Sequence, residues 1–446
     1  MLQESRETMS DTVRLGIAGL GTVGAALVHI VQRKADQMIA GSDVELSISA
    51  VSARSRDKDR GFSTDGMTWF DDPVALAKSD EVDLFVELIG GDEGPARDSV
   101  VAALKAGKSV VTANKALLAK HGVELAELAE ENNVSLNYEA AVAGGIPIIK
   151  TMRESLAGNE IRRVFGIMNG TCNYILTRME ADEISFEDCL ADAQKLGYAE
   201  ADPTFDIGGH DTAHKLAILT SLAFGTQVSF DAIYLEGIQQ ITLEDIKAAD
   251  KLGYRIKLLG VAQITDSGIE QRVHPAMVPA ASAIAQIDGV TNAVTVETDL
   301  LGSIMLSGPG AGGDATASAV AGDIADIARG IALPVFGKPA SSLQSYERAR
   351  MRRHEGGYYI ALNLHDRSGA FASIANRMAE CEISLQSVVQ HEKSDDVGAD
   401  GGAKAMPVII ITHETNEKAV ADALSLIKQD GNVVGEPKMI RIETLS

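Results

Sequence analysis

The chain has 446 residues, which at roughly 100–200 residues per domain suggests two to four domains. Its 40 basic and 63 acidic residues give a net charge of −23, which argues against nucleic acid or an anionic membrane as the main partner. No apolar run reaches the ~20 residues that a membrane span needs. The composition therefore indicates an ordinary globular protein that works away from nucleic acid and membranes.

Cysteine usage and the N-terminus bear on the cellular compartment. Cys172, Cys189 and Cys381 are too few and too scattered for a disulfide framework or a four-ligand zinc site, which favours a reducing environment. Residues 1–11 are polar, lack the apolar centre of a signal peptide, and are expected to form a disordered arm. We therefore expect a cytoplasmic protein.

Residues 11–148 alternate strand-like and helix-like segments, a pattern typical of a parallel sheet with covering helices. Gly107 stands where a helix C-cap is expected. Strands are predicted at 13–18, 44–50, 82–89 and 110–111, and helices at 25–31, 96–106 and 123–131. This unit is predicted to be a Rossmann-like α/β domain.

The junction between the first strand and the first helix has the spacing GxGxxG. Gly19 allows a tight turn, Gly21 lets the backbone approach a pyrophosphate, and Gly24 lets the helix pack on the strand. Thr22 and Val23 open the helix, whose N-terminal N–H groups suit phosphate. The motif predicts a dinucleotide site; the alternative is a tight turn in another α/β protein.

The end of the second strand bears on the choice between NAD and NADP. An NAD-binding fold usually places an acidic residue there, but this segment carries Arg54, Arg56 and Lys58 and no acid at the strand end. A guanidinium suits a 2′-phosphate through paired N–H donors. We therefore expect NADP(H), with Arg54 as the main contact and NAD(H) as the other option. A solvated charged loop is the alternative.

After Pro147 the strands cluster, and residues 149–314 are predicted to form an α+β catalytic and dimerisation domain. A helix within 315–345, from about residue 315 to 332, is expected to pack back on the first domain. The strands of the second domain are predicted at 164–168, 256–264, 269–273, 294–296 and 304–306, and its helices at 186–196 and 211–224.

The C-terminal region begins with a charged segment, 346–356, that we interpret as a solvated linker. Residues 357–446 then follow the order βαββαβ, a ferredoxin-like arrangement, and the Gly-, Asp- and Lys-rich segment 394–404 reads as a mobile hairpin loop. The elements are predicted at 358–364, 371–379, 385–390, 407–412, 418–427 and 433–442.

Chemistry-bearing residues concentrate between 193 and 219, where four acids crowd together ahead of an apolar helix. Asp211 and Lys215 are four residues apart, so they share one face if Asp211 opens that helix. A lysine on a buried helix has a lowered pKa unless carboxylates hold its charge, and can then donate or accept a proton. The alternative is an ordinary surface Asp–Lys pair.

Several motifs resemble those of homoserine dehydrogenases and occur in that family's order between about residues 14 and 343. The resemblance is carried by Glu87-Leu88-Ile89-Gly90-Gly91, Thr112-Ala113-Asn114-Lys115, Asn169-Gly170-Thr171-Cys172-Asn173-Tyr174, Gly197-Tyr198-Ala199-Glu200-Ala201-Asp202-Pro203, Gly209-His210-Asp211-Thr212-Ala213-His214-Lys215 and Gly308-Pro309-Gly310-Ala311-Gly312-Gly313.

The resemblance implies reversible NAD(P)H-dependent reduction of L-aspartate 4-semialdehyde to L-homoserine. It implies that Lys215 exchanges a proton with the substrate oxygen, that Asp211 orients the lysine or binds substrate, and that Lys115 lies near both nicotinamide and substrate. Glu200 would hold the substrate ammonium, and Asp206 would also bind substrate. A carboxylate partner for an ammonium and an ammonium beside a developing oxyanion are physically reasonable.

Two further sites follow from the same resemblance. Gly90 and Gly310 would contact the cofactor. A monovalent cation, Na⁺ or K⁺, would be bound by main-chain carbonyls, which are hard oxygen ligands. These carbonyls would belong to Glu139, Val142, Gly144 and Ile146. From the sequence alone, a glycine-rich turn after a strand is the simpler interpretation of that segment.

The C-terminal unit, with Asp366-Arg367-Ser368-Gly369-Ala370-Phe371, resembles an ACT domain. This resemblance implies feedback by threonine and a homodimer or homotetramer, whereas a purely structural module is the alternative. Two other functions stay open. An acylating semialdehyde dehydrogenase would need Cys172 as its thiolate, and a non-catalytic sensor would bind NADP and amino acids without turnover.

Overall fold

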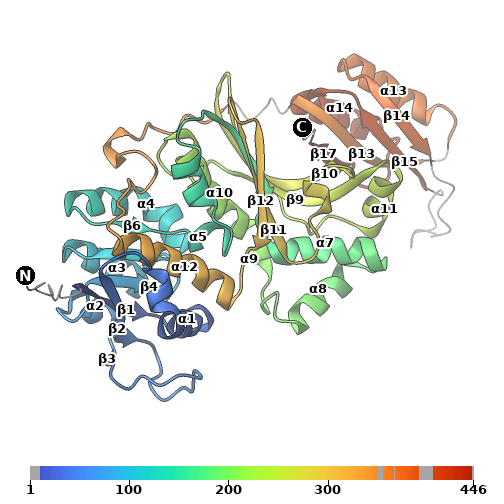
Figure 1. The fold of residues 1–446 in the computed structure, drawn as a ribbon. Helices are drawn as coiled ribbons and strands as arrows, with labels where there is room; N and C mark the ends of the chain where they lie inside the picture. Colours follow the sequence, from blue (N-terminus) through green and yellow to red (C-terminus); the bar gives the residue numbers. More distant parts are fainter. Residues whose placement is uncertain (1–10, 350–354, 366, 391–404, 444–446) are drawn as a thin grey trace, which may run out of the picture.

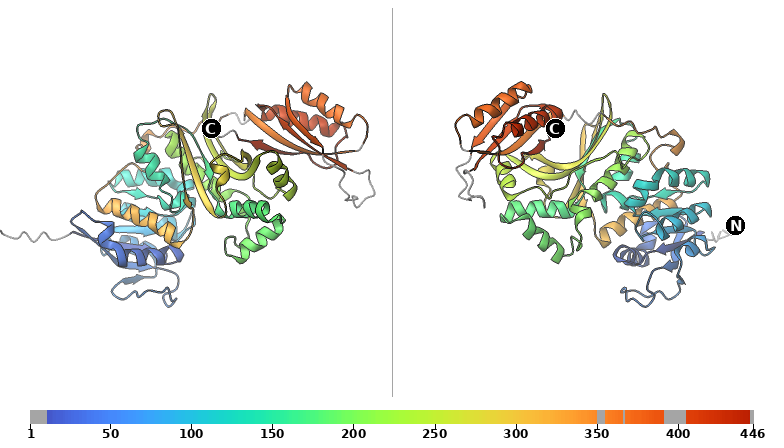
Figure 2. Two further views of the ribbon diagram at one scale, coloured as in Figure 1. Left: turned by 45° about the vertical axis from the view of Figure 1, so that its right-hand side comes forward. Right: turned by 180° about the vertical axis from the view of Figure 1, so that it is seen from behind.

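The computed structural model describes residues 11–349, 355–365, 367–390 and 405–443. Three units follow one another along the molecule, with the N-terminal and C-terminal units at opposite ends (Figures 1 and 2). The predicted hairpin loop at 394–404, Asp366 and all of the predicted N-terminal arm except Asp11 lie outside the described residues. Within the described ranges, no helix is both long and apolar enough to cross a membrane.

The first unit is a six-stranded parallel sheet with the strand order β3-β2-β1-β4-β5-β6. The direction of winding reverses between β1 and β4, which makes the carboxyl ends of these two strands the switch point of the sheet. Its elements are β1 Asp11–Ala18, α1 Thr22–Met38, β2 Val44–Ser52, β3 Thr68–Phe70, α2 Pro73–Lys78, β4 Leu84–Glu87, α3 Pro95–Lys105, β5 Ser109–Thr112, α4 Lys115–Glu131 and β6 Leu136–Asn137.

The predicted strands and helices of this unit are present, but two helices, α1 and α4, are much longer than predicted. Helix α1 was expected at 25–31 and spans Thr22–Met38. Helix α4 was expected from residue 123 but begins at Lys115, because the Asn114 side chain accepts a hydrogen bond from Leu117 N and caps the helix there. The short strands β3 and β6 were not predicted, because strands of two or three residues take their structure from the neighbours with which they pair. The six-residue helix α2 was not predicted either.

Helix α12 (Gly313–Ala328) packs beside α1 on one face of the first sheet (Figure 1). Ala317, Val320 and Ile324 of α12 share a core with Leu27 and Val31 of α1. The prediction of a helix within 315–345 is wrong beyond Ala328, where α12 ends. Gly330 has a positive φ of 77°, which ends a helix, and Pro334 lies in irregular backbone.

The second unit is built on antiparallel strands in the order β12-β11-β7-β9-β10, with α7, α10 and α11 packed on one face. Its elements are α5 Ala140–Ala143, α6 Ile148–Lys150, β7 Ile161–Ile167, α7 Gly170–Asp182, α8 Phe186–Lys195, α9 Thr204–Ile207, α10 His210–Phe224, β8 Tyr234–Leu235, α11 Leu243–Lys251, β9 Tyr254–Thr265, β10 Gly268–Pro279, β11 Thr291–Thr298 and β12 Ser303–Pro309.

The C-terminal unit has the predicted βαββαβ order, with a short β16 (Thr415–Asn416) added. Its elements are β13 Glu355–His365, α13 Ala370–Glu380, β14 Leu385–Gln390, β15 Ala405–Thr412, α14 Glu417–Gln429 and β17 Lys438–Ile442. The last strand starts later than the predicted residue 433, because Gly435 has a positive φ and Pro437 has no N–H for the ladder.

The C-terminal unit is joined to the second unit by backbone hydrogen bonding. Strand β17 runs parallel to β10, so the two sheets form one continuous sheet of eleven strands. Of the predicted solvated linker, residues 347–349 also pair with Ile269, and Ala349 is buried. This part of the segment is therefore docked on the second unit, which corrects the expectation of a solvated linker for these residues.

Candidate active site

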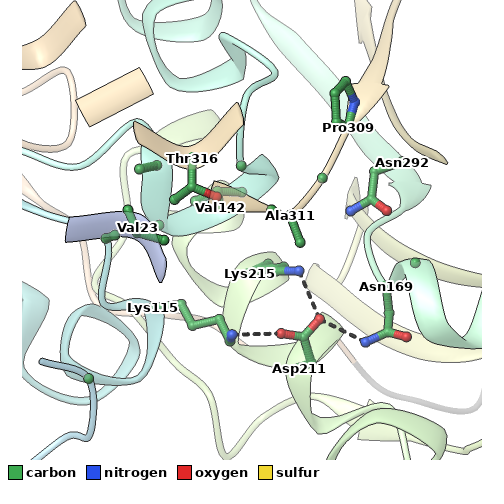
Figure 3. A pocket seen from close by; sticks show the side chains of 18 of the residues that line it. Val23, Lys115, Val142, Asn169, Asp211, Lys215, Asn292, Pro309, Ala311 and Thr316 are labelled. Atoms are coloured by element: carbon green, nitrogen blue, oxygen red, sulfur yellow. Dashed lines mark hydrogen bonds and ion pairs between the residues drawn. The ribbon is translucent and has the colours of Figure 1, made fainter. Parts of the chain in front are cut away.

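A cavity of about 620 Å³ lies where the first unit meets the second, at the carboxyl ends of β1, β4 and β5. Open parallel sheets bind their ligands at such a switch point. The start of α1 borders the cavity on one side, and α10 and β11 face it from the other (Figure 3). The lining includes Val23, Gly90, Lys115, Asn169, Asp206, Asp211, Lys215, Asn292 and Gly310.

The glycine-rich turn is shaped by close backbone contacts. Gly19 has a φ of +102°, and an added β-carbon would lie 2.3 Å from the Leu88 carbonyl oxygen. A β-carbon on Gly24 would lie 2.0 Å from the Gly19 carbonyl oxygen, whereas one on Gly21 would meet nothing within 4 Å. Gly19 and Gly24 are therefore required by the close backbone packing of the turn, whereas Gly21 leaves open space beside it.

The N-terminus of α1 offers a site for an anion. It has no side-chain cap and no acidic residue in its first turn within the described part of the chain. The first N–H groups of such a helix have no intrahelical acceptor and carry the positive end of the helix dipole. The turn with Gly21, Thr22 and Val23 therefore fits the pyrophosphate of a dinucleotide.

The loop after β4 is fixed by Glu87, whose side chain is fully buried. Its carboxylate accepts hydrogen bonds from Ile89 N at 2.8 Å, Gly90 N at 2.9 Å and the Thr112 hydroxyl at 2.6 Å. Three donors satisfy a carboxylate that would otherwise be costly to bury. Glu87 therefore holds Gly90 at the wall of the cavity.

Helix α10 carries the reactive polar groups. Its N-cap, Gly209, has a φ of +86°, and the helix places Asp211 in its first turn and Lys215 one turn later on the same face. The Lys215 ammonium donates to Asp211 Oδ2 at 2.8 Å and to the Met168 carbonyl at 2.6 Å. The other oxygen of Asp211 lies 2.9 Å from the Lys115 ammonium, so one carboxylate holds two lysines (Figure 3).

The two lysines have different pKa shifts. Burial lowers the pKa of Lys215, with Lys115 acting in the same direction and Asp211 only partly opposing it. Burial also acts to lower the pKa of Lys115, but Asp211 outweighs it and the pKa is raised. Burial acts to raise the pKa of Asp211, yet the two ammonium groups hold it well below its usual value. Lys215 is therefore the lysine that releases its proton more readily.

Asn169 connects the acids of the site. It caps α7 by accepting from Cys172 N at 2.8 Å, and its amide nitrogen donates to Asp206 at 2.8 Å and to Asp211 at 3.0 Å. Burial raises the pKa of Asp206, which lines the cavity. The amide thus keeps two neighbouring carboxylates in fixed positions beside Lys215.

Asn292 of β11 closes the opposite wall and is 1% exposed. A β-carbon on Gly310 would lie 2.0 Å from its amide nitrogen, so a glycine is needed at 310. Within the described residues the Asn292 side-chain oxygen has no hydrogen-bond partner. A buried acceptor of this kind fits a ligand that brings an N–H or O–H group.

The structure brings most of the sequence-predicted residues to the cavity. These are Val23, Gly90, Lys115, Asp206, Asp211, Lys215 and Gly310, together with Val142 and Gly144. Gly19, Gly21, Thr22 and Gly24 form the turn beside it. Three groups of predicted residues lie elsewhere: Glu200 is exposed, Arg54 is exposed on the loop after β2, and Glu139 and Ile146 are buried outside the lining.

Two site residues were missed by the sequence reasoning, Asn169 and Asn292. Asn169 lies in a quoted motif and precedes a helix, which is a signal for an N-cap, but nothing in the sequence places its amide between two acids. Asn292 is one polar residue in a strand, and only the pairing of β11 with its neighbours brings it to the cavity.

Cys172 does not have the properties of a nucleophile. Its thiol is buried and donates to the Asp206 carbonyl at 3.3 Å. Burial raises the pKa of this thiol well above its usual value, and Asp206 and Asp211 add to the effect. Because a thiolate is the reactive form, this environment argues against an acylating dehydrogenase. In the part of the chain that the structure describes, no group of three or more His, Cys, Asp and Glu side chains is placed to hold a metal ion.

A parallel sheet with this strand order, a glycine-rich turn at its switch point and a buried lysine–carboxylate set define a nicotinamide-dependent oxidoreductase. Comparison with known proteins agrees. A profile of homoserine dehydrogenase matches residues 147–325, and a profile of the homoserine dehydrogenase NAD-binding domain matches residues 19–139. The chain belongs to the homoserine dehydrogenase family, whose members are oxidoreductases acting on a CH–OH group.

Individual relatives cover nearly the whole chain. It is 42% identical to homoserine dehydrogenase of Neisseria gonorrhoeae over 439 residues, which is 97% of this chain and 99% of that protein. The crystal structure of a homoserine dehydrogenase from Thiobacillus denitrificans superposes with a TM-score of 0.91 at 40% identity, covering 98% and 99% of the two chains. A hyperthermophilic archaeal homoserine dehydrogenase in complex with NADPH has a TM-score of 0.62 at 30% identity, over 71% of this chain and 97% of that one.

Proposed function

We propose that this cavity reduces L-aspartate 4-semialdehyde to L-homoserine with NADPH, reversibly, and that Lys215 exchanges the proton. The observation that carries the proposal is the buried pair of Lys215 and Asp211, joined by the partly exposed Lys115, which faces the N-terminus of α1 across one cavity. A bound nicotinamide supplies and accepts the hydride. The residues of the chain bind the substrate and exchange the proton.

We propose Lys215 as the proton donor because it is buried, its pKa is lowered, and two acceptors hold its nitrogen in place. Negative charge builds on the aldehyde oxygen as the carbonyl is reduced, and the ammonium stabilises that charge and protonates the oxygen. In the reverse direction, neutral Lys215 takes the proton of the alcohol. Asp211 and the Met168 carbonyl orient the ammonium throughout.

The substrate ammonium needs a carboxylate partner. Asp206 lies at the cavity and its pKa is raised by burial, so a cation beside it is favourable. Glu200 lies on the exposed segment that follows Gly197, whose φ is +76°. We propose that Glu200 reaches the ammonium when this segment moves toward a bound substrate. Lys115 contacts both the substrate and the cofactor side of the cavity.

We propose NADP(H) as the preferred cofactor, with NAD(H) also accepted, because three cations on the loop after β2 suit a 2′-phosphate. Arg54, Arg56 and Lys58 lie exposed on this loop. Arg60 shapes the loop by donating to the carbonyls of Leu20, Ser55 and Lys58.

A substitution tests the role of Arg54. If Arg54 binds the phosphate, Arg54→Ala raises the KM for NADPH about tenfold and leaves the KM for NADH unchanged. An equal change in KM for both cofactors contradicts the role.

We propose a monovalent cation, Na⁺ or K⁺, on the main-chain carbonyls of Glu139, Val142, Gly144 and Ile146. Neutral carbonyl oxygens are ligands that hard cations accept. The segment turns sharply at Gly144, where a β-carbon would lie 2.4 Å from the Gly310 carbonyl oxygen. A cation there would stabilise the wall of the cavity.

We propose that the C-terminal unit is an ACT regulatory domain and that threonine is its effector. A second cavity, of about 580 Å³, lies between α11 and the sheet of this unit, and acids and lysines both line it, which suits a zwitterion. The enzyme is proposed to form a homodimer or homotetramer.

One assay tests the proposed function. NADPH and NADH oxidation are followed with aspartate semialdehyde, with and without threonine. We expect fast turnover with NADPH and inhibition by threonine. The absence of turnover with either cofactor would favour a non-catalytic sensor, and turnover unaffected by threonine would remove the effector from the proposal.

A further inference from the structure

The segment from Tyr234 to Ile238, which starts with β8 beside β10 and continues as a loop, lies between the C-terminal unit and the turn that carries Asp206 and Asp211. We call this segment the 234–238 loop. On the side of that turn, Ile238 N donates to the Ile207 carbonyl at 2.9 Å. A β-carbon on Gly237 would lie 2.2 Å from the same carbonyl oxygen. The loop therefore packs against the backbone at the end of α9 with no space between them.

The turn that the loop contacts sets the spacing of two acids. Asp206 is in α9 and Asp211 is in the first turn of α10, and Gly208 and Gly209 connect the two helices. A β-carbon on Gly209 would lie 3.0 Å from the Leu235 side chain, so the loop also packs on this glycine. A displacement of the loop is therefore transmitted to the positions of Asp206 and Asp211.

On its other side the loop is bound by the C-terminal unit. Glu236 accepts from Arg441 of β17 at 3.0 Å, and the Arg441 guanidinium lies 4.9 Å from the ring centre of Tyr234. Arg441 is 1% exposed and also pairs with Glu417 of α14, which in turn pairs with Arg272 of β10. A buried guanidinium needs its anionic partners, so this connection is held firmly.

The connection continues through the backbone. Glu236 N donates to the Val273 carbonyl of β10 at 2.8 Å, and β10 pairs with β17 through Ala276 and Arg441. Arg441 therefore both pairs with β10 through its backbone and binds the 234–238 loop through its side chain.

We propose that Glu236 and Arg441 are positioning residues, through which the docked C-terminal unit sets the placement of Asp206 and Asp211 relative to Lys215. The proposal rests on the proposed function of that site. It adds a physical connection between the C-terminal unit and the reacting groups that needs no direct contact between them.

The test uses the full-length chain and the variant Glu236→Gln, which keeps the size of a half-exposed side chain and removes its charge. Small displacements of reacting groups cost up to ~100-fold in rate, and we expect kcat to fall roughly tenfold. The KM for the substrate should rise by less, through Asp206, and the KM for NADPH should stay unchanged. If Asp211 moves away from Lys215, the ammonium loses its counter-charge. The pH midpoint of homoserine oxidation then shifts to lower pH.

Arg163→Gln is the matched control. Arg163 of β7 binds Glu443 at the end of β17 at 2.5 Å, so this pair also joins the two units, but it does not touch the 234–238 loop. We expect an unchanged kcat and an unchanged pH midpoint in this variant. Equal losses in Glu236→Gln and Arg163→Gln would mean that loosened docking in general is responsible, and the proposal would be overturned.

Wild-type kcat and pH midpoint in Glu236→Gln would also overturn it. Arg441→Gln should reduce kcat, and its combination with Glu236→Gln should be less than additive because both remove one connection. If Arg441→Gln does not fold, Glu236→Gln and its control decide alone. An inactive wild-type chain would instead refute the proposed function.

Discussion

Helices α1 and α10 both begin at a glycine beside the same cavity, and their N-termini differ in charge. The first turn of α1 has no acidic residue, whereas that of α10 contains Asp211. Neither of these two N-termini has a side-chain cap. Both N-termini therefore present free backbone N–H groups near one cavity, but only α10 carries a negatively charged side chain, Asp211, in its first turn.

The difference teaches how one local pattern serves two purposes. At α1 the uncapped N–H groups suit the phosphates of a ligand, which bring negative charge from outside. At α10 Asp211 fills that electrostatic role, and its carboxylate then binds Lys215 and Lys115. The charge of the first turn, rather than the glycine before it, distinguishes a ligand-binding helix end from a catalytic one.

The largest expected effect follows from removing the proposed proton donor on α10. Lys215→Met keeps an unbranched side chain of similar length, and we expect kcat for semialdehyde reduction to fall by at least ~100-fold. Lys105→Met, at an exposed lysine in the last turn of α3, is the control and should keep wild-type kcat. Wild-type turnover in Lys215→Met would remove this lysine from the mechanism.

The second prediction separates the two roles of the glycines at α1. Gly21→Ala has space for its methyl group, so the melting temperature should stay the same while the KM for NADPH rises roughly tenfold, about 1.4 kcal/mol. Gly24→Ala should lower the melting temperature, because its methyl group overlaps the Gly19 carbonyl. Equal melting temperatures and equal KM values for the two variants would show that the distinction between the glycines is wrong.

A smaller effect is expected at the amide that supports Asp211. Asn169→Ser keeps a capping oxygen for α7 but loses the hydrogen bonds to Asp206 and Asp211. We expect kcat to fall about fivefold, close to ~1 kcal/mol for a lost hydrogen bond. Asp72→Ser also keeps a capping oxygen, at the start of α2, which does not line the cavity, and should leave kcat unchanged. Equal kcat values in the two variants would contradict the role of Asn169.

The smallest expected change is a shift along the pH axis. If Lys215 exchanges the proton as proposed, homoserine oxidation needs its neutral form, so kcat should rise with pH through the pKa of this lysine, which burial holds below its ordinary value. Semialdehyde reduction should fall through the same range. Lys115→Met removes a neighbouring positive charge and should move the oxidation midpoint to higher pH. A midpoint that does not move in the variant would mean that the two lysines are not coupled.

Local sequence was enough to predict most of the regular elements. The alternation of apolar strands and helices and the GxGxxG spacing predicted the sheet of the first unit, and the βαββαβ order was readable in the C-terminal unit. These signals are local, because side-chain period and glycine conformation act within a few residues. The start of α4 at Lys115 and the end of α12 at Ala328 were placed less well, since one cap and one glycine decide them.

The sequence by itself determined that Asp211 and Lys215 share a helix face and that a glycine turn opens α1. Only the tertiary structure decided that Lys115 of the first unit reaches Asp211, that Asn169 lies between two acids, and that Arg441 of the last strand binds Glu236. The physical reason is the range of the contacts. Helical spacing is set within one turn, whereas each of these contacts joins residues far apart in the chain and forms only after the elements that carry them have packed together.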